Sequence, residues 1–245
     1  DVAAGVKGIA NYAVGFNNID VDACTRRGIP VSNTPNVLTD TTADLAWALM
    51  FSVARRIVEG DRYVRDGKFK GWGPLMLLGD DLTGKTLGIV GGGRIGMATA
   101  ARAVGFSMPV LYTSRNRHED IEAIGAQHRA LDDLLQASDF VSIHVPLMPE
   151  TTHLIGSREL NLMKSTAYLI NTARGPIVDE KALVTALRNG IIAGAGLDVF
   201  EREPELEPGL ADLDNAVIVP HVGSGTVATR IKMGNKAATN LIAMV

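Results

Sequence analysis

Short apolar runs recur along the last two thirds of the chain, and stretches with helix-like spacing of apolar residues separate most of them. Apolar runs of this length are typical of strands buried on both faces of a parallel sheet. Alternation of such strands with helices predicts an α/β fold, a doubly wound parallel sheet with helices on both faces. The predicted strands cover residues 86–90, 109–113, 139–143, 167–171, 194–198 and 216–219, and the predicted helices cover 94–104, 121–124, 131–136, 157–163 and 180–188.

A glycine-rich turn joins the first of these strands to the first helix. Gly91, Gly93 and Gly96 stand in the order G-x-G-x-x-G, directly after the strand and at the start of an alanine-rich helix. The first glycine permits a tight turn, the second lets the backbone approach a pyrophosphate, and the third lets the helix pack on the strand. The helix start at Arg94 and Ile95 would face the anion. The motif therefore predicts a Rossmann-like dinucleotide-binding domain.

The two ends of the chain do not fit inside that domain. Residues 1–36 contain strand-like pieces at 6–10 and 30–32 but are too few to build a core of their own. A long apolar helix is predicted from Thr42 to about Val58, and the chain stops at Val245 within another apparent helix. We therefore expect a partial second lobe at 1–36, the dinucleotide-binding domain at 37–225 and a return helix at 226–245. We also expect part of the second lobe to lie outside this sequence, because the chain starts at Asp1 without an initiator Met.

Composition narrows the function classes. The 245 residues are 46% hydrophobic, which supports a large core, and the net charge of −3 argues against a nucleic-acid or anionic-membrane partner. The single cysteine, Cys24, excludes an intrachain disulfide and is compatible with a reducing, cytoplasmic location. The longest apolar run, 45–54, is too short to span a membrane, and no basic-then-apolar leader is visible at the N-terminus. No His, Cys, Asp or Glu spacing is typical of a metal site, so we predict none.

The residues after the second strand bear on the choice of cofactor. An NAD site usually has an acidic residue there, about 20 residues past the glycines, to bind the ribose hydroxyls. This chain has Ser114, Arg115 and Arg117 instead. Arginine can bind a 2′-phosphate bidentately and serine can donate a hydrogen bond to it. We therefore predict that NADP(H) is preferred over NAD(H), unless the arginines only form a solvated loop.

Four polar residues lie at or just past predicted strand ends, where the ligand crevice of such a sheet opens. They are Arg174, Asp198, Glu203 and His221. Hydride transfer to a ketone needs a proton donor to the carbonyl oxygen and a cation for a substrate carboxylate, which histidine and arginine can supply. An ionised carboxylate such as Glu203 would favour the imidazolium form of a neighbouring histidine.

The chain resembles the D-2-hydroxyacid dehydrogenase family, and within it the glyoxylate/hydroxypyruvate reductases. The resemblance rests on the glycine motif, Asn171–Gly175, Gly196–Phe200 with Glu203-Pro204, and Pro220–Ser224, together with 38–44, Trp72–Leu75 and the Ser114/Arg115 loop. It implies a flavodoxin-like substrate lobe of which residues 1–36 are a part, since family members have a longer N-terminal portion.

The same resemblance implies roles for individual residues. His221 would be the proton donor in reduction, Glu203 its carboxylate partner, and Arg174 the group that binds the substrate carboxylate and polarises the carbonyl. Asp198 would bind the nicotinamide amide, and Thr172 would also contact the cofactor. The backbone of Val14 and Gly15 would bind the substrate carboxylate. The apolar run Met76–Leu78 would help to form a two-fold homodimer, the alternative being burial against its own domain.

The sequence thus predicts an oxidoreductase that transfers a hydride from NADPH to a small 2-keto acid, glyoxylate or hydroxypyruvate. Two alternatives stay open. One is an NAD-dependent relative such as a phosphoglycerate dehydrogenase, against which Ser114 and Arg115 weigh. The other is a dinucleotide-sensing, corepressor-like interaction protein, because such proteins can retain the same Arg174, Glu203 and His221 set. Elsewhere, we expect a packed structural role for His144 and a surface position for His153.

Overall fold

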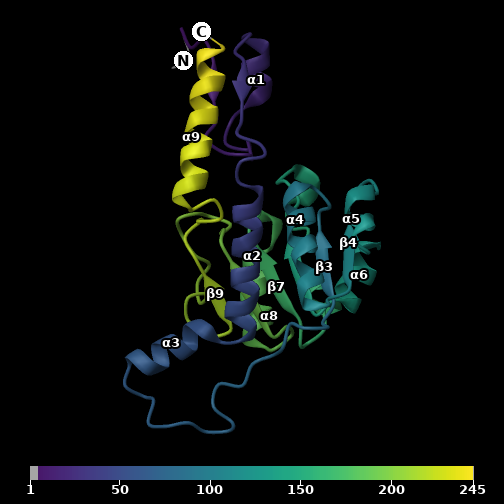
Figure 1. Cartoon of the computed structure of the whole chain (residues 1–245). Coiled ribbons are helices and arrows are strands. Elements are labelled where there is room, and N and C mark those ends of the chain that lie inside the picture. Colours follow the sequence, from purple (N-terminus) through teal and green to yellow (C-terminus); the bar gives the residue numbers. More distant parts are fainter. Residues whose placement is uncertain (1–4, 245) are drawn as a thin grey trace. The chain divides into compact units, whose positions relative to one another are not determined.

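The computed structural model describes residues 5–244 (Figure 1). The chain divides into two compact units, one of residues 42–223 and one of residues 5–41 with 224–244. The larger unit contains the sheet and nearly all of the polar residues singled out above. The smaller unit contains Val14 and Gly15.

The larger unit is built on a parallel sheet of seven strands in the order β5-β4-β3-β6-β7-β8-β9. The chain runs outward from β3 to β4 and β5, then returns to the other side of β3 at β6, which makes the β3/β6 boundary the switch point where ligands bind in such sheets. The fold class predicted from the sequence is confirmed. The strands are β3 (Leu87–Val90), β4 (Val110–Thr113), β5 (Gln127–His128), β6 (Phe140–Ile143), β7 (Tyr168–Asn171), β8 (Gly194–Leu197) and β9 (Ala216–Ile218).

The prediction of six strands was wrong by one, because β5 was missed. This strand has only two residues, Gln127 and His128, and it pairs with β4 at the edge of the sheet. An edge strand with polar side chains lacks the apolar run that identifies a buried strand.

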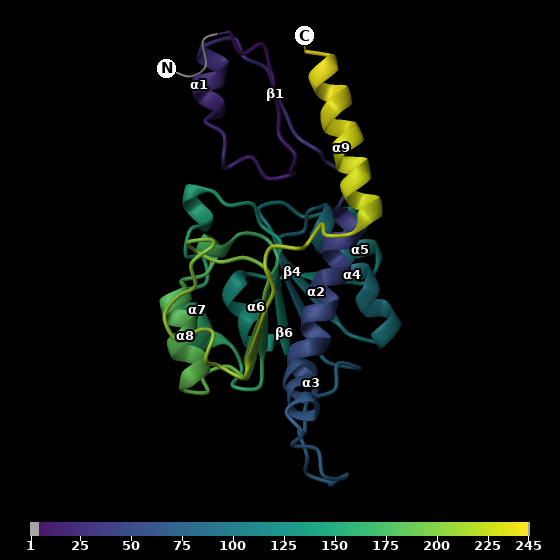
Figure 2. The ribbon, with the colours of Figure 1, turned by 90° about the vertical axis from the view of Figure 1, so that its left-hand side faces the viewer.

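Helices cover both faces of the sheet, as Figures 1 and 2 show. One core contains buried side chains of α6, α7 and α8, and the other contains those of α2, α4 and α5. Leu87 and Ile89 of β3 point to the second core and Val90 to the first, which is the period-two alternation of a strand. The helices are α4 (Arg94–Ala103), α5 (Glu119–Ala123), α6 (Leu131–Ala137), α7 (Ser157–Leu162) and α8 (Glu180–Arg188), with short 3-10 turns η1 (Val104–Phe106), η2 (Pro149–Thr151) and η3 (Gly175–Ile177).

The long apolar helix predicted to start at Thr42 is two helices. The first, α2, spans Thr39–Ala54, and the second, α3, spans Ile57–Arg65. Arg56 between them has φ 51°, a left-handed conformation that ends a helix. After α3 the chain forms an extended arm, residues 66–80, that loops away from the sheet (Figure 1).

The smaller unit contains two short parallel strands, β1 (Ile9–Ala10) and β2 (Val31–Ser32), with α1 (Val21–Arg26) and α9 (Val227–Ile242). The helix α9 packs on the strand region: Tyr12 donates to the Arg230 carbonyl at 2.6 Å, and Asn240 donates to the Asn33 carbonyl at 3.0 Å. The helix ends at Ile242, and Val245, which the sequence placed in a helix, lies outside the described residues. Within residues 5–244, none of the helices is both long and apolar enough to cross a membrane.

Candidate active site

The turn between β3 and α4 has the shape that the glycine motif requires. Gly91 has φ 109°, and a Cβ on it would lie 2.7 Å from the carbonyl carbon of His144. A Cβ on Gly96 would lie 2.0 Å from the Gly91 carbonyl oxygen, so only glycine lets α4 start this close to the turn. The two glycines are therefore fixed by packing within the protein.

Gly93 differs, because a Cβ there would meet no protein atom within 4 Å. Gly93 is the N-cap of α4, and no side chain hydrogen bonds to the first turn of this helix. The backbone N–H groups at Arg94 and Ile95 therefore begin a helix whose end carries partial positive charge and has open space beside it. A dinucleotide pyrophosphate fits this arrangement.

A second observation also fits a bound cofactor. The Thr172 hydroxyl, just past the end of β7, is buried and has no hydrogen-bond partner among residues 5–244. A buried hydroxyl without a partner costs free energy unless a ligand satisfies it. Thr172 is thus an orphaned polar group at the carboxyl edge of the sheet, where the sequence predicts cofactor contacts.

In the loop after β4, the three residues predicted to select the cofactor make different contacts. Arg117 donates two hydrogen bonds to Glu122, at 2.8 and 3.0 Å, and Glu122 also accepts from the Tyr112 hydroxyl at 2.6 Å. The Arg115 guanidinium is exposed and pairs with no group in the described part of the chain, and Ser114 hydrogen bonds to the Asn116 carbonyl. Arg115 is consequently the arginine available to a phosphate, whereas Arg117 braces the loop.

Arg174 projects from a turn that follows β7. Asn171, at the end of this strand, shapes the turn: its side chain donates to the Arg174 carbonyl at 2.9 Å and accepts from the Ala173 amide at 3.0 Å. Burial lowers the pKa of the Arg174 guanidinium, and the negative charge of Glu203 acts in the opposite direction. Arg174 is therefore a partly buried cation whose charge is felt by Glu203.

His221 and Glu203 form a direct pair. The Nδ1 atom of His221 lies 2.9 Å from Glu203 Oε2, and the other oxygen of Glu203 accepts from the Phe200 amide at 3.0 Å. The imidazole is about half exposed, and its Nε2 has no partner among the described residues. An imidazole fixed at Nδ1 by a carboxylate can exchange a proton with a ligand through Nε2.

Asp198 holds the loop that carries His221. Its carboxylate accepts from the amides of Val222 at 2.6 Å and Gly223 at 2.7 Å, and its carbonyl accepts from the His221 amide at 2.8 Å. Burial raises the pKa of Asp198, and the two amide hydrogen bonds oppose this. The structure thus gives Asp198 a bracing contact that sequence reasoning missed.

The structure brings Arg174, Asp198, Glu203 and His221 together at the carboxyl edge of the sheet, on the same unit as the glycine turn. Val14 and Gly15 belong to the other unit. There Val14 O accepts from Asn33, and Gly15 O from Asn11, while neither residue's N–H donates to any group of residues 5–244. Within this same range, no group of three or more His, Cys, Asp or Glu could hold a metal ion.

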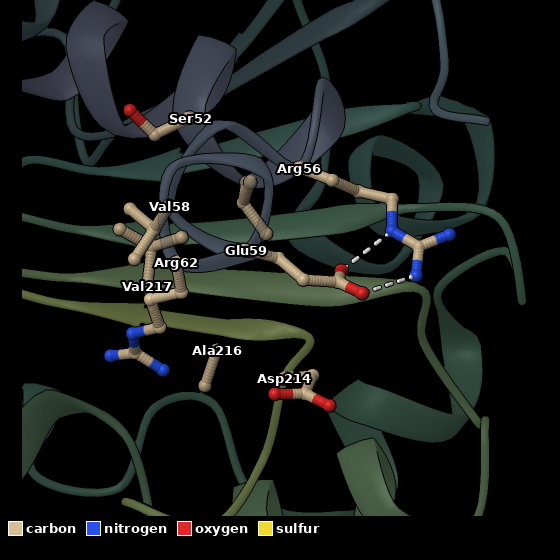
Figure 3. Close-up of a pocket in the computed structure, with 9 residues that line it drawn as sticks. Ser52, Arg56, Val58, Glu59, Arg62, Asp214, Ala216 and Val217 are labelled. Carbon is tan, nitrogen blue, oxygen red and sulfur yellow. Dashed lines mark hydrogen bonds and ion pairs between the residues drawn. The ribbon is translucent and has the colours of Figure 1, made fainter. Parts of the chain in front are cut away.

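A small pocket elsewhere in the larger unit contains none of the predicted site residues. It lies between the α2–α3 bend and the start of β9 (Figure 3). His221 follows the other end of this strand, which spans Ala216–Ile218. Arg56 and Glu59, which both line the pocket, form an ion pair at 2.7 Å. Its lining residues are Ser52, Val53, Arg56, Val58, Glu59, Arg62, Asp214, Ala216 and Val217.

The fold and site define a nicotinamide-dinucleotide-dependent α/β enzyme, and the comparisons with known proteins specify it further. Residues 47–223 match the family model described as D-isomer specific 2-hydroxyacid dehydrogenase, NAD binding domain. The chain belongs to this family. It is an NAD(P)-dependent dehydrogenase, a reductase of 2-keto acids.

Individual relatives agree with this assignment. A glyoxylate reductase of Thermococcus litoralis is 57% identical over 243 residues, covering 97% of this chain and 73% of the relative. The structure of an NADPH-dependent glyoxylate/hydroxypyruvate reductase of Sinorhizobium meliloti, in complex with NADP and malonate, matches at 38% identity and a TM-score of 0.90, covering 96% of this chain and 73% of that one. A D-lactate dehydrogenase of Aquifex aeolicus, complexed with NAD and lactic acid, matches at 33% identity and a TM-score of 0.88, covering 96% and 75%.

Proposed function

We propose that this 2-keto acid reductase reduces glyoxylate or hydroxypyruvate with NADPH. The observation that carries the proposal is the His221–Glu203 pair at the strand ends, with the Arg174 cation close enough to interact with Glu203. The named activities of the Thermococcus litoralis and Sinorhizobium meliloti relatives support the substrate class.

The roles of the residues follow from their chemistry. The nicotinamide cofactor, when bound, supplies the hydride that reduces the keto carbon. Arg174 binds the substrate carboxylate and polarises the neighbouring carbonyl. His221 donates a proton from Nε2 to the carbonyl oxygen as negative charge develops there, and Glu203 stabilises the imidazolium form through Nδ1. Oxidation of the hydroxy acid would use the same groups in reverse.

Gly91, Gly93, Gly96 and the helix start at Arg94 and Ile95 would hold the pyrophosphate. Thr172 and Asp198 would contact the nicotinamide half. Of the loop residues Ser114, Arg115 and Arg117, Arg115 with Ser114 is proposed to favour NADPH as the direct phosphate contact, whereas Arg117, engaged by Glu122, is proposed to hold the loop for either cofactor. The Sinorhizobium meliloti relative is named as NADPH-dependent and was solved with NADP, whereas the Aquifex aeolicus relative was solved with NAD.

Variants of the two arginines test this division of roles. Arg115→Ala should raise the KM for NADPH by roughly 10- to 100-fold and leave the KM for NADH nearly unchanged, because it removes a charge-assisted contact to the 2′-phosphate alone. Arg117→Ala is the matched control and should affect NADPH and NADH alike. Equal losses with both cofactors in Arg115→Ala would contradict the assignment.

The main experiment follows the absorbance loss of NADPH and of NADH with glyoxylate and hydroxypyruvate in turn, on wild type and His221→Asn. We expect turnover with NADPH and a loss of at least 100-fold in the variant. Turnover with NADH and a phosphorylated hydroxy or keto acid would favour the phosphoglycerate dehydrogenase alternative. Tight cofactor binding without turnover of any 2-keto acid would favour the sensor.

We further infer a homodimer, and a substrate lobe to which residues 1–36 and the return helix 226–245 belong. The backbone N–H groups of Val14 and Gly15 are proposed to bind the substrate carboxylate, which agrees with their having no hydrogen-bond acceptor among residues 5–244. The proposed dimer contact is the arm, whose Trp72 and Leu75 side chains are more than four-fifths exposed. In the predicted run Met76–Leu78, Leu78 is also exposed but Met76 and Leu77 are half-buried, so only part of this run is free to contact a partner.

A further inference from the structure

Glu180, which has no part in the mechanism above, is a buried carboxylate behind the site. It lies in the first turn of α8 and is 3% exposed, and its Oε2 has no hydrogen-bond partner among residues 5–244. The cap of the helix is provided by Asp179, whose side chain accepts from the Ala182 amide. Glu180 is therefore not needed as a cap, and its burial calls for another explanation.

The contacts of Glu180 lead to the loop that carries Glu203. Its Oε1 accepts from the Glu201 amide at 2.8 Å, and Glu201 Oε2 accepts in return from the Glu180 amide at 3.3 Å. The neighbouring amide, of Phe200, donates to Glu203 Oε1. Two adjacent amides of one loop are thus held by two carboxylates, one buried and one paired with His221.

The Phe200–Glu201 peptide also contacts the turn that carries Arg174. A Cβ on Gly175 would lie 1.9 Å from the Phe200 carbonyl carbon, so the two backbones are in direct contact. His153 joins these segments from a third side: its amide donates to the Pro176 carbonyl at 2.8 Å, and its Nε2 lies 2.8 Å from Glu201 Oε1. The Phe200–Glu201 peptide is therefore the junction of the Arg174 turn and the Glu203 loop.

We propose that Glu180 is a positioning residue, which holds the Phe200–Glu201 peptide in place and thereby aims Glu203 at His221. This inference rests on the proposed function, because it takes His221 and Glu203 as the acid/base pair. A reacting group must be held close to its productive geometry, and supporting hydrogen bonds from neighbouring residues hold it there. The buried carboxylate is thus explained by its effect on the reacting group, since burial alone disfavours it.

The charged groups that face Glu180 and His221 determine which residues can contribute to the pH dependence of the rate. Glu180 faces Glu201 and Glu207, and Glu201 in turn faces His153. His221 faces Glu203 and Asp198, and Arg174 acts on Glu203. A displacement of Glu203 should therefore change the turnover rate through its contact with His221. The charges of Asp198 and Arg174, which also act on this pair, are unaltered in the variants.

The test compares Glu180→Ala, which removes the acceptor for the Glu201 amide, with Glu180→Gln, which keeps it. We expect Glu180→Ala to lower kcat by roughly 10-fold per folded molecule. The pH at which the rate falls should move in the same direction as in Glu203→Gln. Glu180→Gln should restore most of the rate. In the Glu203→Gln background, the added Glu180→Ala substitution should lower kcat by less than a further 2-fold, because the two residues act through one contact.

Glu159 offers a matched control. It lies in the first turn of α7, pairs with Arg158 and accepts from the Gly156 amide, but it does not contact the Glu203 loop. Glu159→Ala should lower the melting temperature without changing kcat or the pH profile. If Glu180→Ala behaved like Glu159→Ala, or if its effect were fully additive with that of Glu203→Gln, the proposal would be overturned.

Two further measurements separate this proposal from its premise. NMR of the His221 ring without substrate should show the Nδ1 resonance of Glu180→Ala displaced towards that of Glu203→Gln, whichever keto acid is the substrate, because the hydrogen bond to Glu203 is disturbed in both. An unchanged Nδ1 resonance with normal wild-type turnover overturns the positioning role alone, whereas absent wild-type turnover concerns the proposed function. If Glu180→Ala does not fold, Glu180→Asp, which retracts the oxygen by roughly 1.5 Å, takes its place in every comparison.

Discussion

At the scale of single residues, backbone groups hold two of the side chains of the candidate site. The Arg174 guanidinium donates to the Ala173 carbonyl at 2.7 Å, and Glu203 divides its two oxygens between the Phe200 amide and His221. Such contacts orient a side chain without any contribution from the substrate. Because each side chain is proposed to act on a different group of the reactants, we expect a substitution to change one kinetic constant selectively.

Removal of the positive charge in Arg174→Met should raise the KM for the keto acid by roughly 100-fold, since it removes a charge-assisted contact to a carboxylate from a partly buried place. The KM for NADPH should change less than about 3-fold. Steady-state kinetics with one substrate varied at a time would measure both. Arg158→Met, at an exposed ion pair, is the control. Equal losses for keto acid and cofactor would show that Arg174 has only a structural role.

The burial of His144 leads us to predict how the free energy of unfolding changes with pH. Burial lowers the pKa of His144 from 6.5 to about 3, and its Nε2 lies 2.9 Å from the Ser142 hydroxyl. Between these values the unfolded chain binds a proton that the folded chain does not, so stability falls as the pH decreases from 6.5 towards 3. The slope is at most about 1.4 kcal/mol per pH unit. Urea unfolding at several pH values should give a flatter curve for His144→Gln, and parallel curves would contradict this reading.

At the scale of elements, the β3–α4 turn contains two kinds of glycine that a variant pair can distinguish. A Cβ on Gly96 would overlap the Gly91 carbonyl, whereas one on Gly93 would meet only open space. Gly96→Ala should therefore destabilise the fold by roughly 1–3 kcal/mol. Gly93→Ala should cost less than about 1 kcal/mol of stability and weaken NADPH binding by at least 10-fold, because the methyl group occupies the proposed phosphate position.

Thermal melts and a fluorescence titration with NADPH measure the two effects separately. Gly105→Ala provides a control, since a Cβ at Gly105 also meets no atom within 4 Å but lies beyond the other end of α4. It should change neither quantity. Unchanged NADPH affinity in Gly93→Ala would argue that the pyrophosphate does not bind over this residue.

Element prediction succeeded where the pattern reflects burial on one or two faces. The strands of the central sheet and the helix Glu180–Arg188 follow directly from apolar periodicity. The failures have local causes: β5 is a polar edge strand, and the α2–α3 break depends on a left-handed Arg56 that no glycine marks. In the candidate site, the motif residues, Asn171 among them, were found from the sequence, but the bracing contacts of Asn171 and the contributions of Glu180 and Glu201 were not. Those contacts join residues distant in sequence or use backbone groups, which leave no side-chain pattern.

At the scale of the whole molecule, the exposed apolar side chains of the arm need an explanation. Trp72 is 84% and Leu75 is 81% exposed, although each would gain roughly 1.5–3 kcal/mol from burial. Leu78 and Phe69 on the same arm are also exposed, so four exposed large apolar side chains lie between residues 69 and 78. A two-fold interface would bury each of these residues twice, once on each copy.

We therefore predict that the protein is a dimer at micromolar concentration and that Leu75→Asp, or Trp72→Asp, shifts it to the monomer. Light scattering coupled to size-exclusion chromatography gives the mass directly. Val104 is 61% exposed on the 3-10 turn after α4, away from the arm in sequence, so Val104→Asp is the matched control and should leave the mass unchanged. A wild-type monomer, or a Leu75→Asp variant that keeps the wild-type mass, would exclude the arm as the interface. If the arm of one copy also supports the active site of the other, the monomeric variant should lose turnover. Its affinity for NADPH, measured without keto acid, should stay within about 3-fold of the wild-type value, because the glycine turn precedes α4 and is not part of the arm.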